Sequence, residues 1–304
     1  MYDVIIIGAG PAGLTAGLYA GRARLNTLIF EQLIVGGQVA LTQTIENFPG
    51  FPGEIKTEEL IERLTKQVND LGIKIANAQI KEISSKGREF ILVDSEDKEH
   101  YAKTIILATG AQPKKINVPG EDKLIGRGVS YCAVCDGPLY KEKDIVVVGG
   151  GDRAVEEAIF LSRFAKTIKL VHRRDSLRAT KILQEHLKKN TKITVVWNSV
   201  VTEILGENKV EAVKIKDVKT EKESTINCHG VFLAIGVTPN TQFLNGIIKT
   251  DEFGYIITAE DLMTSLPGLF ACGDCRRRPL LQVVTACAEG ALAAFSADKY
   301  LESL

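Results

Sequence analysis

The chain has 304 residues, a length that suggests two domains of about 150 residues each. Lysines and arginines number 38, as do aspartates and glutamates, so the charge gives no reason to expect a nucleic acid or a membrane surface as a partner. Hydrophobic residues make up 45% of the chain, and no apolar run approaches the roughly 18 residues of a membrane span, so we expect a globular protein without a membrane segment.

The N-terminus and the cysteine content both favour a cytoplasmic protein. "MYDVIIIGAG" enters a strand almost at once, and no signal peptide with its basic and apolar regions precedes it. Six cysteines in a chain of this length do not resemble a secreted disulfide scaffold. In a compartment that keeps thiols reduced, a Cys-X-X-Cys pair is more often catalytic or metal-binding than a structural staple.

The first predicted strand and helix carry a dinucleotide-binding pattern. A β-branched run, "VIIIGAGPAG", ends in Gly8, Gly10 and Gly13 directly before an amphipathic helix. The first glycine permits a tight turn, the second lets the backbone approach a pyrophosphate, and the third lets the helix pack closely on the strand. Glu31 ends the next strand, about 20 residues further on, where a carboxylate can bind ribose hydroxyls.

A helix, a strand and two cysteines follow in that order. We predict a helix over 57–72 and a buried strand in "TIILATGAQP", residues 104–113. "YCAVCDG" then places Cys132 and Cys135 two residues apart, with Asp136 directly after them. Taken alone, this pair is compatible with a disulfide staple, half of a metal site or a redox couple.

A second glycine motif repeats the first. "IVVVGGGDRA" (145–154) is again a buried strand that ends in a glycine cluster and opens a helix. It contributes Gly149, Gly150 and Gly151, with Ala154 at the third fingerprint position, which tolerates alanine.

The strand after the second motif ends in arginines rather than in a carboxylate. In "KLVHRRDSLRA", residues 169–179, these are Arg173, Arg174 and Arg178. Guanidinium groups suit a 2′-phosphate, which a carboxylate would repel. We therefore expect this site to prefer NADPH to NADH; the alternative is a solvated basic turn before the helix predicted over 179–190.

The alternation of strands and helices predicts an α/β fold with two Rossmann-like dinucleotide-binding domains and mainly parallel sheets. Residues 230–239 echo the strand at 104–113, a strand follows in 269–275, and a long helix over 282–301 has small residues on one face. We expect this tail to return to the first domain. The first domain then consists of residues 1–115 and 245–304, and the second domain, residues 116–244, is inserted between these two parts. One site would hold a flavin, which accepts a hydride from the nicotinamide in the other and passes electrons to a dithiol.

Taken in order, the motifs resemble the low-molecular-weight thioredoxin reductases, essentially from end to end. The motifs that carry this resemblance are "GAGPAG", "GGQ" (36–38), "ENFPGFPG" (46–53), "ATGA" (108–111), "CAVCDG", "GGGDRAVEEA", "HRRDSLRA", "ACGD" and "QVVTACAEGALAA". The resemblance implies a homodimer that binds FAD in the first domain and NADPH in the inserted domain. It also implies that Cys132 exchanges with the thioredoxin disulfide, that Cys135 lies nearer the flavin, and that Asp136 donates a proton.

The motifs and the resemblance together assign two sets of cofactor residues. The FAD set is Gly8, Gly10, Pro11, Ala12, Gly13, Glu31, Gly37, Gln38, Asn47, Thr109, Gly110, Asp274, Gln282 and Val283. The NADPH set is Gly149, Gly151, Asp152, Arg153, Ala154, His172, Arg173, Arg174 and Arg178. His172 is expected to be structural rather than catalytic.

Three features depart from the family pattern. Leu281 stands where arginine is usual, and Arg153 where a small hydroxyl residue is usual. These two changes leave ferredoxin or a deazaflavin as alternative electron donors, although the arginine cluster favours NADPH. The third feature is the basic run 276–278, which we expect to be a solvated face; the alternative is that it tunes a nucleotide or partner contact, for example by steering an acidic protein.

Cys272 and Cys275 form a second Cys-X-X-Cys pair. Two such pairs can make a zinc site, but the resemblance puts them in different domains and reserves Asp274 for the flavin, so we expect no metal. Cys272, Cys275, Cys228 and Cys287 are expected to be small buried residues.

Three rival functions remain on the sequence alone. A flavin dithiol oxidase would not need the arginines of the nucleotide site. A peroxiredoxin-reducing flavoprotein would carry an extra N-terminal thioredoxin-like region. A flavin-binding redox sensor would show no turnover with NADPH. The identity of the thioredoxin-like partner is not encoded in any motif.

Overall fold

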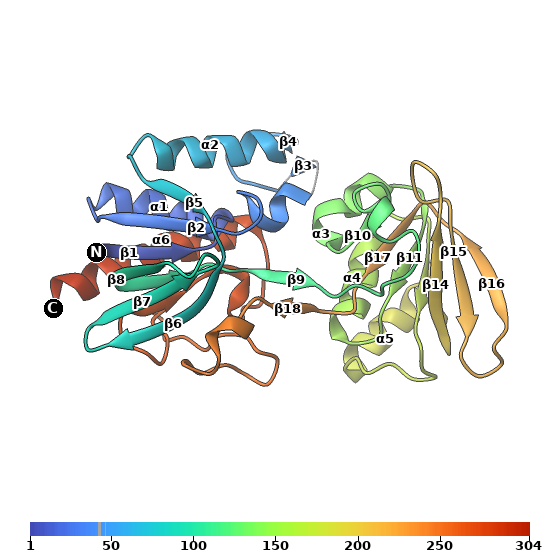
Figure 1. Ribbon diagram of the computed structural model, residues 1–304. Coiled ribbons are helices and arrows are strands. Elements are labelled where there is room, and N and C mark those ends of the chain that lie inside the picture. Colours follow the sequence, from blue (N-terminus) through green and yellow to red (C-terminus); the bar gives the residue numbers. More distant parts are fainter. Residues whose placement is uncertain (42–43, 46) are drawn as a thin grey trace. The chain divides into compact units, whose positions relative to one another are not determined.

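The computed structural model describes residues 1–41, 44–45 and 47–304. The chain divides into two compact units: unit 1 is Met1–Gln112 with Thr238–Leu304, and unit 2 is Pro113–Val237. Where the chain leaves and re-enters unit 1, β9 (Ala111–Pro113) pairs with β18 (Val237–Pro239). The predicted α/β class is confirmed (Figure 1). The predicted limits at 115 and 244 and the nucleotide of each domain remain predictions.

Unit 1 is built on a sheet that has, among the described residues, seven strands in the order β5-β2-β1-β8-β7-β6, with β19 also paired to β8. Its parallel part consists of β5, β2, β1, β8 and β19, while β6, β7 and β8 run antiparallel. Residues 4–7 of β1 are all buried, as expected for a central strand covered on both faces. The strands are β1 (Tyr2–Ile7), β2 (Thr27–Glu31), β5 (Lys74–Asn77), β6 (Ile80–Lys86), β7 (Glu89–Asp94), β8 (Glu99–Leu107) and β19 (Leu269–Ala271).

Two helices of unit 1, far apart in the sequence, pack closely because their contact faces consist of small residues. These are α1 (Pro11–Arg22) and α6 (Val283–Glu302). A Cβ on Gly290 of α6 would lie 2.1 Å from the carbonyl oxygen of Ala12, so only glycine fits there. The buried residues of α6 are Ala286, Gly290, Ala293, Ala294 and Ala297. This confirms the small-residue face predicted for the final helix.

The remaining elements of unit 1 are short, apart from α2 (Thr57–Asn69), which lies within the predicted 57–72 helix. They are η1 (Gly37–Leu41), β3 (Thr44–Ile45), β4 (Ile55–Lys56), η4 (Gln242–Leu244) and η5 (Gly273–Cys275). Within the described residues, no helix combines the length and the apolar character that crossing a bilayer requires.

Unit 2 contains a second parallel sheet, which in the described chain has the order β10-β17-β11-β12-β13. Its strands are β10 (Val129–Ser130), β11 (Asp144–Val148), β12 (Thr167–Val171), β13 (Ile193–Val196) and β17 (Gly230–Leu233). Its helices are η2 (Asp122–Leu124), α3 (Ala133–Asp136), η3 (Gly137–Tyr140), α4 (Asp152–Leu161) and α5 (Lys181–Lys189). The succession β11, α4, β12 repeats β1, α1, β2 of unit 1, as the internal repeat predicts.

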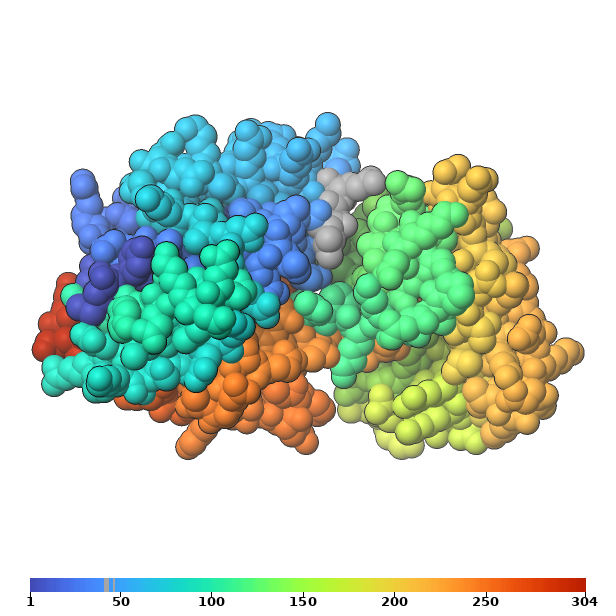
Figure 2. Space-filling model, in the orientation of Figure 1, coloured from blue at the N-terminus to red at the C-terminus, as the bar shows by residue number. Residues whose placement is uncertain are grey.

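An antiparallel sheet completes unit 2: β14 (Ser199–Leu205), β15 (Ala212–Asp217) and β16 (Glu223–Asn227). β16 is exposed along most of its length and forms part of the yellow-to-orange surface in Figure 2. The prediction of mainly parallel sheets did not include this sheet. In β14 the residues at 199, 201 and 204 are buried and those between them are half-buried, a partial alternation of the kind that marks such strands.

Candidate functional site

The glycine turn of unit 1 is closed toward the sheet and open above Gly10. Gly8 has φ +105°, and a Cβ on it would lie 2.3 Å from the carbonyl oxygen of Ala108. A Cβ on Gly13 would lie 1.8 Å from the carbonyl oxygen of Gly8. Around Gly10 the nearest atom to a Cβ would be 4.0 Å away. Because α1 begins at Pro11 directly beyond this open space, its free N–H groups suit an anionic pyrophosphate.

Glu31, at the end of β2, is fixed beside the same turn. Its Oε2 accepts a hydrogen bond from the N–H of Ala9 at 2.7 Å, and its Oε1 accepts one from the N–H of Leu33 at 3.0 Å. Each carboxylate oxygen has a further lone pair for a ribose hydroxyl. The acid therefore stands where the dinucleotide pattern predicts it.

Other motifs of the predicted FAD set meet this turn from distant parts of the sequence. Gly37 is placed so that its Cβ would lie 3.5 Å from Cα of Gly10, and Gln38 follows it in η1. Nδ2 of Asn47 donates to Oε1 of Gln282 at 2.9 Å, directly before Val283 opens α6. Glu46 of the same motif lies outside the described residues.

The turn after β8 is held by a side chain from the other end of unit 1. Nδ2 of Asn240 donates to the carbonyl oxygen of Thr109 at 2.8 Å, and the N–H of Asn240 donates to that of Gly110 at 3.0 Å. Gly110 has φ +67°, and no atom lies within 4 Å of the Cβ that a larger residue would add. This turn therefore also borders open space at the carboxyl edge of the sheet.

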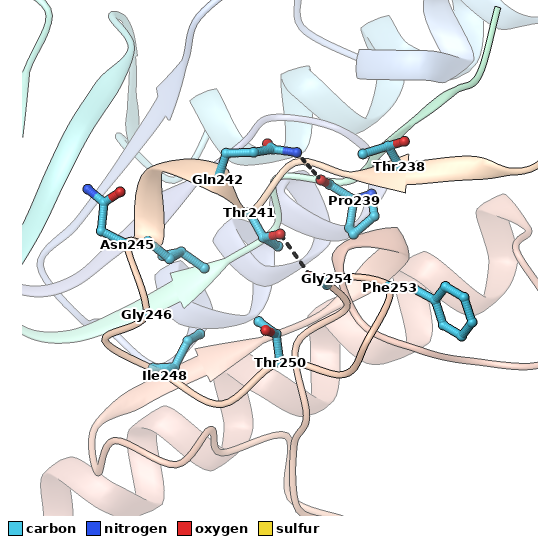
Figure 3. Close-up of a pocket in the computed structure, with 11 residues that line it drawn as sticks. Thr238, Pro239, Thr241, Gln242, Asn245, Gly246, Ile248, Thr250, Phe253 and Gly254 are labelled. Atoms are coloured by element: carbon cyan, nitrogen blue, oxygen red, sulfur yellow. Dashed lines mark hydrogen bonds between the residues drawn. The ribbon is translucent and has the colours of Figure 1, made fainter.

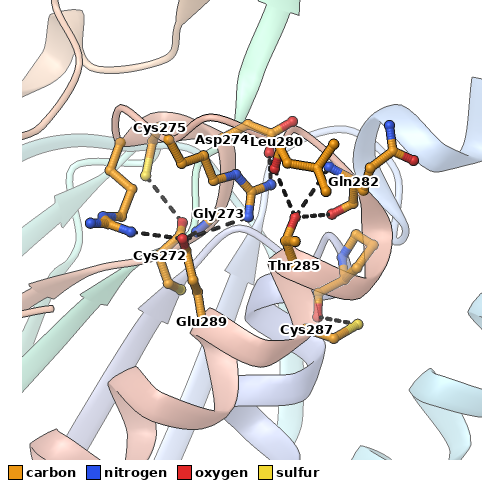
Figure 4. Close-up of polar contacts among 12 residues, drawn as sticks. Cys272, Gly273, Asp274, Cys275, Leu280, Gln282, Thr285, Cys287 and Glu289 are labelled. Atoms are coloured by element: carbon orange, nitrogen blue, oxygen red, sulfur yellow. Dashed lines mark hydrogen bonds and ion pairs between the residues drawn. The ribbon is translucent and has the colours of Figure 1, made fainter. Parts of the chain in front are cut away.

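Asp274 belongs to a network of charged side chains that Figure 4 shows. Arg278, whose side chain is only 4% exposed, pairs with Asp274 and lies 3.6 Å from Glu289. Arg276 pairs with Glu289 at 2.7 Å, and the other Glu289 oxygen accepts from the N–H of Gly273 at 2.8 Å. The predicted solvated face is therefore wrong for Arg276 and Arg278.

Arg277 is the member of the basic run that does face solvent, since its side chain is 73% exposed. Nothing in a run of three basic residues indicates that acidic side chains pair with two of them. Their partner Glu289 lies in α6, and only the return of that helix to unit 1 brings the carboxylate to them.

The other cysteines are mostly buried, as predicted. Cys228, Cys272 and Cys275 are almost or completely inaccessible, and Cys287 is half-buried. Burial raises the pKa of the Cys275 thiol to about 11 and that of Cys228 to about 12. Across the residues that the structure describes, no group of three or more histidine, cysteine or acidic side chains is placed to hold a metal ion.

The glycine turn of unit 2 has the same construction as that of unit 1. A Cβ on Gly149, which has φ +155°, would meet Cβ of Ala154 at 2.5 Å, whereas no atom lies within 4 Å of a Cβ on Gly151. His172 packs against Gly150 and approaches the carbonyl oxygen of Ser176 at 3.1 Å. Burial lowers the pKa of His172, which fits the predicted structural role.

The predicted 2′-phosphate cluster stands beside this turn. Arg173, Arg174 and Arg178 are exposed, and within the described part of the chain none of their guanidinium groups has a hydrogen-bond or ion-pair partner. The N–H of Arg178 donates to the carbonyl oxygen of Gly150 at 2.8 Å. This hydrogen bond fixes the segment 173–178, which carries the three arginines, against the glycine turn. Asp152, the first residue of α4, accepts from the N–H of Thr180 at 2.6 Å. Three unpaired cations next to an open glycine turn fit a phosphorylated dinucleotide.

Cys132 and Cys135 form a disulfide at the start of α3. The N–H of Cys135 donates to Sγ of Cys132 at 3.2 Å, and Oγ of Ser130 accepts from the N–H of Cys132 at 3.1 Å. Both cysteines are partly exposed, so the pair is accessible to a reductant or to a protein disulfide.

Asp136 is half-buried directly after the pair. Burial raises its pKa, opposed by a hydrogen bond with Ser130. Tyr140 lies close enough to Asp136 to feel its charge, and burial raises the pKa of this phenol to about 12. Asp136 therefore keeps a proton to a higher pH than an exposed aspartate, as a proton donor requires.

The motifs did not reveal which residues hold the redox loop, the name used here for residues 131–136, which contain Cys132 and Cys135. The hydroxyl of Tyr131 donates to Oε1 of Glu121 at 2.8 Å, and Glu121 also accepts backbone N–H groups from Ile116 and Asn117. Arg153, predicted as a nucleotide residue, directs its guanidinium at Glu157 and at the carbonyl oxygen of Tyr131. A lone acidic residue ten or more positions away carries no local signal of such contacts.

A pocket of about 270 Å³ lies elsewhere in unit 1, around η4 and the turn at Gly254 (Figure 3). Its polar side chains bond within the chain: Thr241 donates to the Gly254 carbonyl at 2.8 Å and Gln242 donates to that of Pro239 at 3.1 Å. Among the described residues that line this pocket, none is charged and none belongs to the predicted site. It therefore lacks the groups that either dinucleotide would need.

Comparisons with known proteins give one consistent result. The family model described as pyridine nucleotide-disulphide oxidoreductase matches residues 2–290. A thioredoxin reductase of Bacillus subtilis is 48% identical over 305 residues, covering 100% of this chain and 96% of its own, and one of Listeria innocua is 47% identical, covering 100% and 95%. The crystal structure of a thioredoxin reductase from Streptococcus pyogenes matches with a TM-score of 0.95 at 44% identity, covering 100% of this chain and 99% of its own.

The match extends through both units, since it covers residues 2–290 for the family model and the whole chain for these relatives. It thus agrees with the motifs from which the resemblance was first drawn. The chain belongs to the pyridine nucleotide-disulphide oxidoreductase family, among the thioredoxin reductases.

Proposed function

We propose that the protein transfers electrons from NADPH, through bound FAD and the Cys132–Cys135 pair, to the disulfide of thioredoxin or a thioredoxin-like protein. The observation that carries this proposal is the placement of the pair in unit 2, the same unit that presents unpaired arginines at a glycine turn. A purely structural disulfide would need neither the unpaired arginines nor the glycine turn.

Unit 1 supplies the flavin site. The open space above Gly10, the fixed Glu31 carboxylate and the Asn47–Gln282 contact fit FAD at the carboxyl edge of the sheet. Arg278 and Glu289 hold Asp274 and its neighbour Gly273 in place. When bound, FAD supplies a carrier that accepts a hydride and delivers two electrons to a disulfide.

Unit 2 supplies the nucleotide site. The N-terminus of α4 suits the pyrophosphate, and Arg173, Arg174 and Arg178 suit the 2′-phosphate. We expect NADPH as the donor for this reason. Leu281 and Arg153 remain the residues to vary if another donor proves to act.

The thiol chemistry follows from the pair itself. Reduction of the Cys132–Cys135 bond takes two electrons and two protons and gives two thiols. The Cys132 thiolate then attacks the partner disulfide, forming a mixed disulfide and expelling one partner thiolate. Cys135 attacks Cys132 in turn, which re-forms the original bond and releases the second partner thiolate. The Cys135 N–H that points at Sγ of Cys132 stabilises the thiolate.

Asp136 supplies or takes the proton in these steps. Its position next to Cys135 and its raised pKa suit it to hold a proton to a higher pH than an exposed aspartate and to release it to a departing thiolate. Val134, between the cysteines, is 40% exposed and Leu139 is 50% exposed, so an apolar surface accompanies the pair, as suits a protein partner.

The first experiment is anaerobic mixing of the purified flavoprotein with NADPH and, separately, NADH, while the flavin absorbance is followed. Rapid bleaching by NADPH, followed by turnover on added thioredoxin, is the expected result. If neither nucleotide bleaches a flavin that dithionite still reduces, NADPH is not the donor, and ferredoxin or a deazaflavin is tested next. If NADPH bleaches the flavin and no thioredoxin is reduced, the partner assignment is wrong.

A trapping experiment tests the roles of the two cysteines. Cys135→Ser removes the resolving thiol. Thioredoxin that lacks its own resolving cysteine is supplied with its remaining cysteine as a mixed disulfide with thionitrobenzoate, so attack by the Cys132 thiolate expels thionitrobenzoate and leaves a Cys132–thioredoxin disulfide that is visible by mass. Cys132→Ser should give no such adduct, although the same number of thiols remains. Adduct formation in the second variant and not in the first would reverse the assignment.

We further infer a homodimer that works in the cytoplasm, the expectation drawn from the family resemblance and from the cysteine content. Light scattering coupled to gel filtration measures the mass directly. A chain of 33.1 kDa should then give twice that mass.

A further inference from the structure

Arg153 joins the nucleotide-binding helix of unit 2 to the redox loop. It is the second residue of α4, and its Nη2 donates to the carbonyl oxygen of Tyr131 at 3.1 Å. That carbonyl belongs to the peptide group whose N–H comes from Cys132. Arg153 is thus a direct side-chain link from the helix after the glycine turn to the backbone at the first redox cysteine.

The charge of Arg153 is balanced by Glu157 one turn along the same helix. Nε of Arg153 donates to Oε1 of Glu157 at 2.7 Å, and the two side chains are 37% and 13% exposed. The second oxygen, Oε2, is buried and, among the described residues, has no hydrogen-bond partner. Burial raises the pKa of Glu157 and the arginine opposes that rise. A buried carboxylate with one unsatisfied oxygen depends on its arginine to stay ionised.

Two further side chains, those of Glu121 and Ser130, bind the redox loop, and neither carries a positive charge. The hydroxyl of Tyr131 bonds Glu121, and Ser130 bonds the N–H of Cys132. Within the described part of the chain, Arg153 is the cation that hydrogen-bonds to this loop, and its contact is with the peptide group that joins Tyr131 to Cys132, so its charge is placed close to the Cys132 thiolate. A guanidinium next to a carbonyl also fixes the orientation of the peptide group that carries the Cys132 N–H.

We propose that Arg153 is a positioning residue for the disulfide reaction, whose contact with the Tyr131 carbonyl sets the reactivity of Cys132, with Glu157 limiting the charge that reaches the thiolate. This inference rests on the proposed function in that it takes Cys132 and Cys135 as the redox pair. It adds two residues that no motif assigns to the thiol chemistry, on the helix that begins at the nucleotide turn.

The test measures the redox equilibrium and the reactivity of the two thiols directly, without NADPH or thioredoxin. The flavin-loaded enzyme is equilibrated in mixtures of reduced and oxidised dithiothreitol, in which each Cys132–Cys135 bond reduced consumes one dithiol and yields one cyclic disulfide. Alkylation and mass analysis then give the reduced fraction, and the flavin absorbance gives the state of the flavin in the same sample. The rate of iodoacetamide labelling of Cys132 in the reduced enzyme is measured in parallel.

Two substitutions should act in opposite directions. Arg153→Met keeps an apolar stem of similar length and removes the charge, so labelling should slow about threefold and the pair should be harder to reduce. Glu157→Gln keeps the volume and leaves the guanidinium uncompensated, so labelling should speed up by about the same factor. Arg153→Lys should lie between wild type and Arg153→Met, because lysine keeps the charge but loses the planar fork.

Arg163→Met is the matched control, since this arginine lies just beyond α4, over the ring of Phe160, and should change neither quantity. A loss of fold or packing would move both variants in the same direction. The proposal is overturned if Arg153→Met and Glu157→Gln shift the equilibrium in the same direction, or if Arg153→Met leaves both readouts at wild type. A failure of NADPH or thioredoxin to act leaves these measurements intact and counts against the proposed function instead.

Discussion

Asn47 and Gln282 are separated by 235 positions in the chain, yet Nδ2 of Asn47 donates a hydrogen bond to Oε1 of Gln282 at 2.9 Å. The contact ties the loop before β4 to the N-terminus of α6, two segments that both carry residues of the predicted FAD set. A flavin bound there would be held from two sides by residues that also hold each other.

Asn47→Ala should therefore weaken flavin retention about tenfold, because the contact that we propose between Asn47 and the cofactor is lost together with the support of Gln282. Flavin release on serial dilution, followed by fluorescence, measures the affinity. The double variant with Gln282→Ala should lose less than the sum of the two single losses. Strictly additive losses would show that the two side chains act independently.

Neutralising the arginine cluster should remove the proposed preference for NADPH over NADH. The triple variant Arg173→Gln, Arg174→Gln, Arg178→Gln loses its exposed, unpaired guanidinium groups, so kcat/KM for NADPH should fall about 100-fold while that for NADH changes little. Steady-state kinetics with both nucleotides give the ratio. Arg163→Gln, outside the turn, is the control, and an unchanged ratio in the triple variant would count against a 2′-phosphate site.

Asp136 should give the reaction an alkaline limit. Burial raises its folded pKa, so the carboxyl keeps its proton below that value and loses it as the pH rises through it. Thioredoxin reduction should accordingly decline on the alkaline side. Asp136→Asn should lower the rate about 100-fold and abolish this limb, because the amide has no proton to release. A wild-type alkaline limb that survives in the variant would assign the proton to another group.

Asp94 should make stability fall in acid. A hydrogen bond with His100 lowers its folded pKa, aided by the N–H groups of Lys98 and Glu96 and opposed by burial. Because the folded pKa lies below the unfolded one, its stabilisation is present above about pH 4 and is lost as the pH falls through the folded value. Urea unfolding at several pH values should show a shallower acid decline for Asp94→Asn. Asp97→Asn, with its side chain 84% exposed, is the comparison and should retain the wild-type slope.

Gly290→Ala tests the contact between α1 and α6. Alanine normally stabilises a helix by about 1 kcal/mol relative to glycine. Here its Cβ would lie 2.1 Å from the Ala12 carbonyl oxygen, so the helices must separate, and a net loss of about 2 kcal/mol is expected. Chemical unfolding measures it, with Ala288→Ser on the exposed face of α6 as the control. If Gly290→Ala were more stable than the wild type, the two helices would be able to move apart at little cost in free energy.

Much of the fold is readable from short stretches because its determinants are local. Gly8, Gly10 and Gly13 follow a β-branched strand and precede a helix, and this local order marks the turn even though the carbonyl that excludes a Cβ at Gly8 comes from Ala108. The same holds for the turn at Gly149 and for the helices predicted over 57–72 and 282–301. The small residues on one face of the last helix also indicate that this helix packs closely against another element, as it does in the first domain.

Charge partnerships could not be read in the same way. The run 276–278 predicts a solvated face, yet Arg278 is 4% exposed because Glu289 and Asp274 meet it inside unit 1. A sequence gives the sign of each charge but not the distance between charges, and burial of a cation depends on that distance. The antiparallel strands of unit 2 were missed for a different reason, since their alternation is weak beside the strong dinucleotide repeat.

By itself, the sequence determined the α/β class, the two dinucleotide turns and the Cys-X-X-Cys pair, because each depends on the order of neighbouring residues. Only the tertiary structure decided which side chains support them: Asn47 with Gln282, Arg278 with Asp274 and Glu289, and Arg153 with the carbonyl of Tyr131. Those contacts join segments that no spacing rule connects, and they exist because the packing of strands and helices brings distant polar groups within hydrogen-bonding distance.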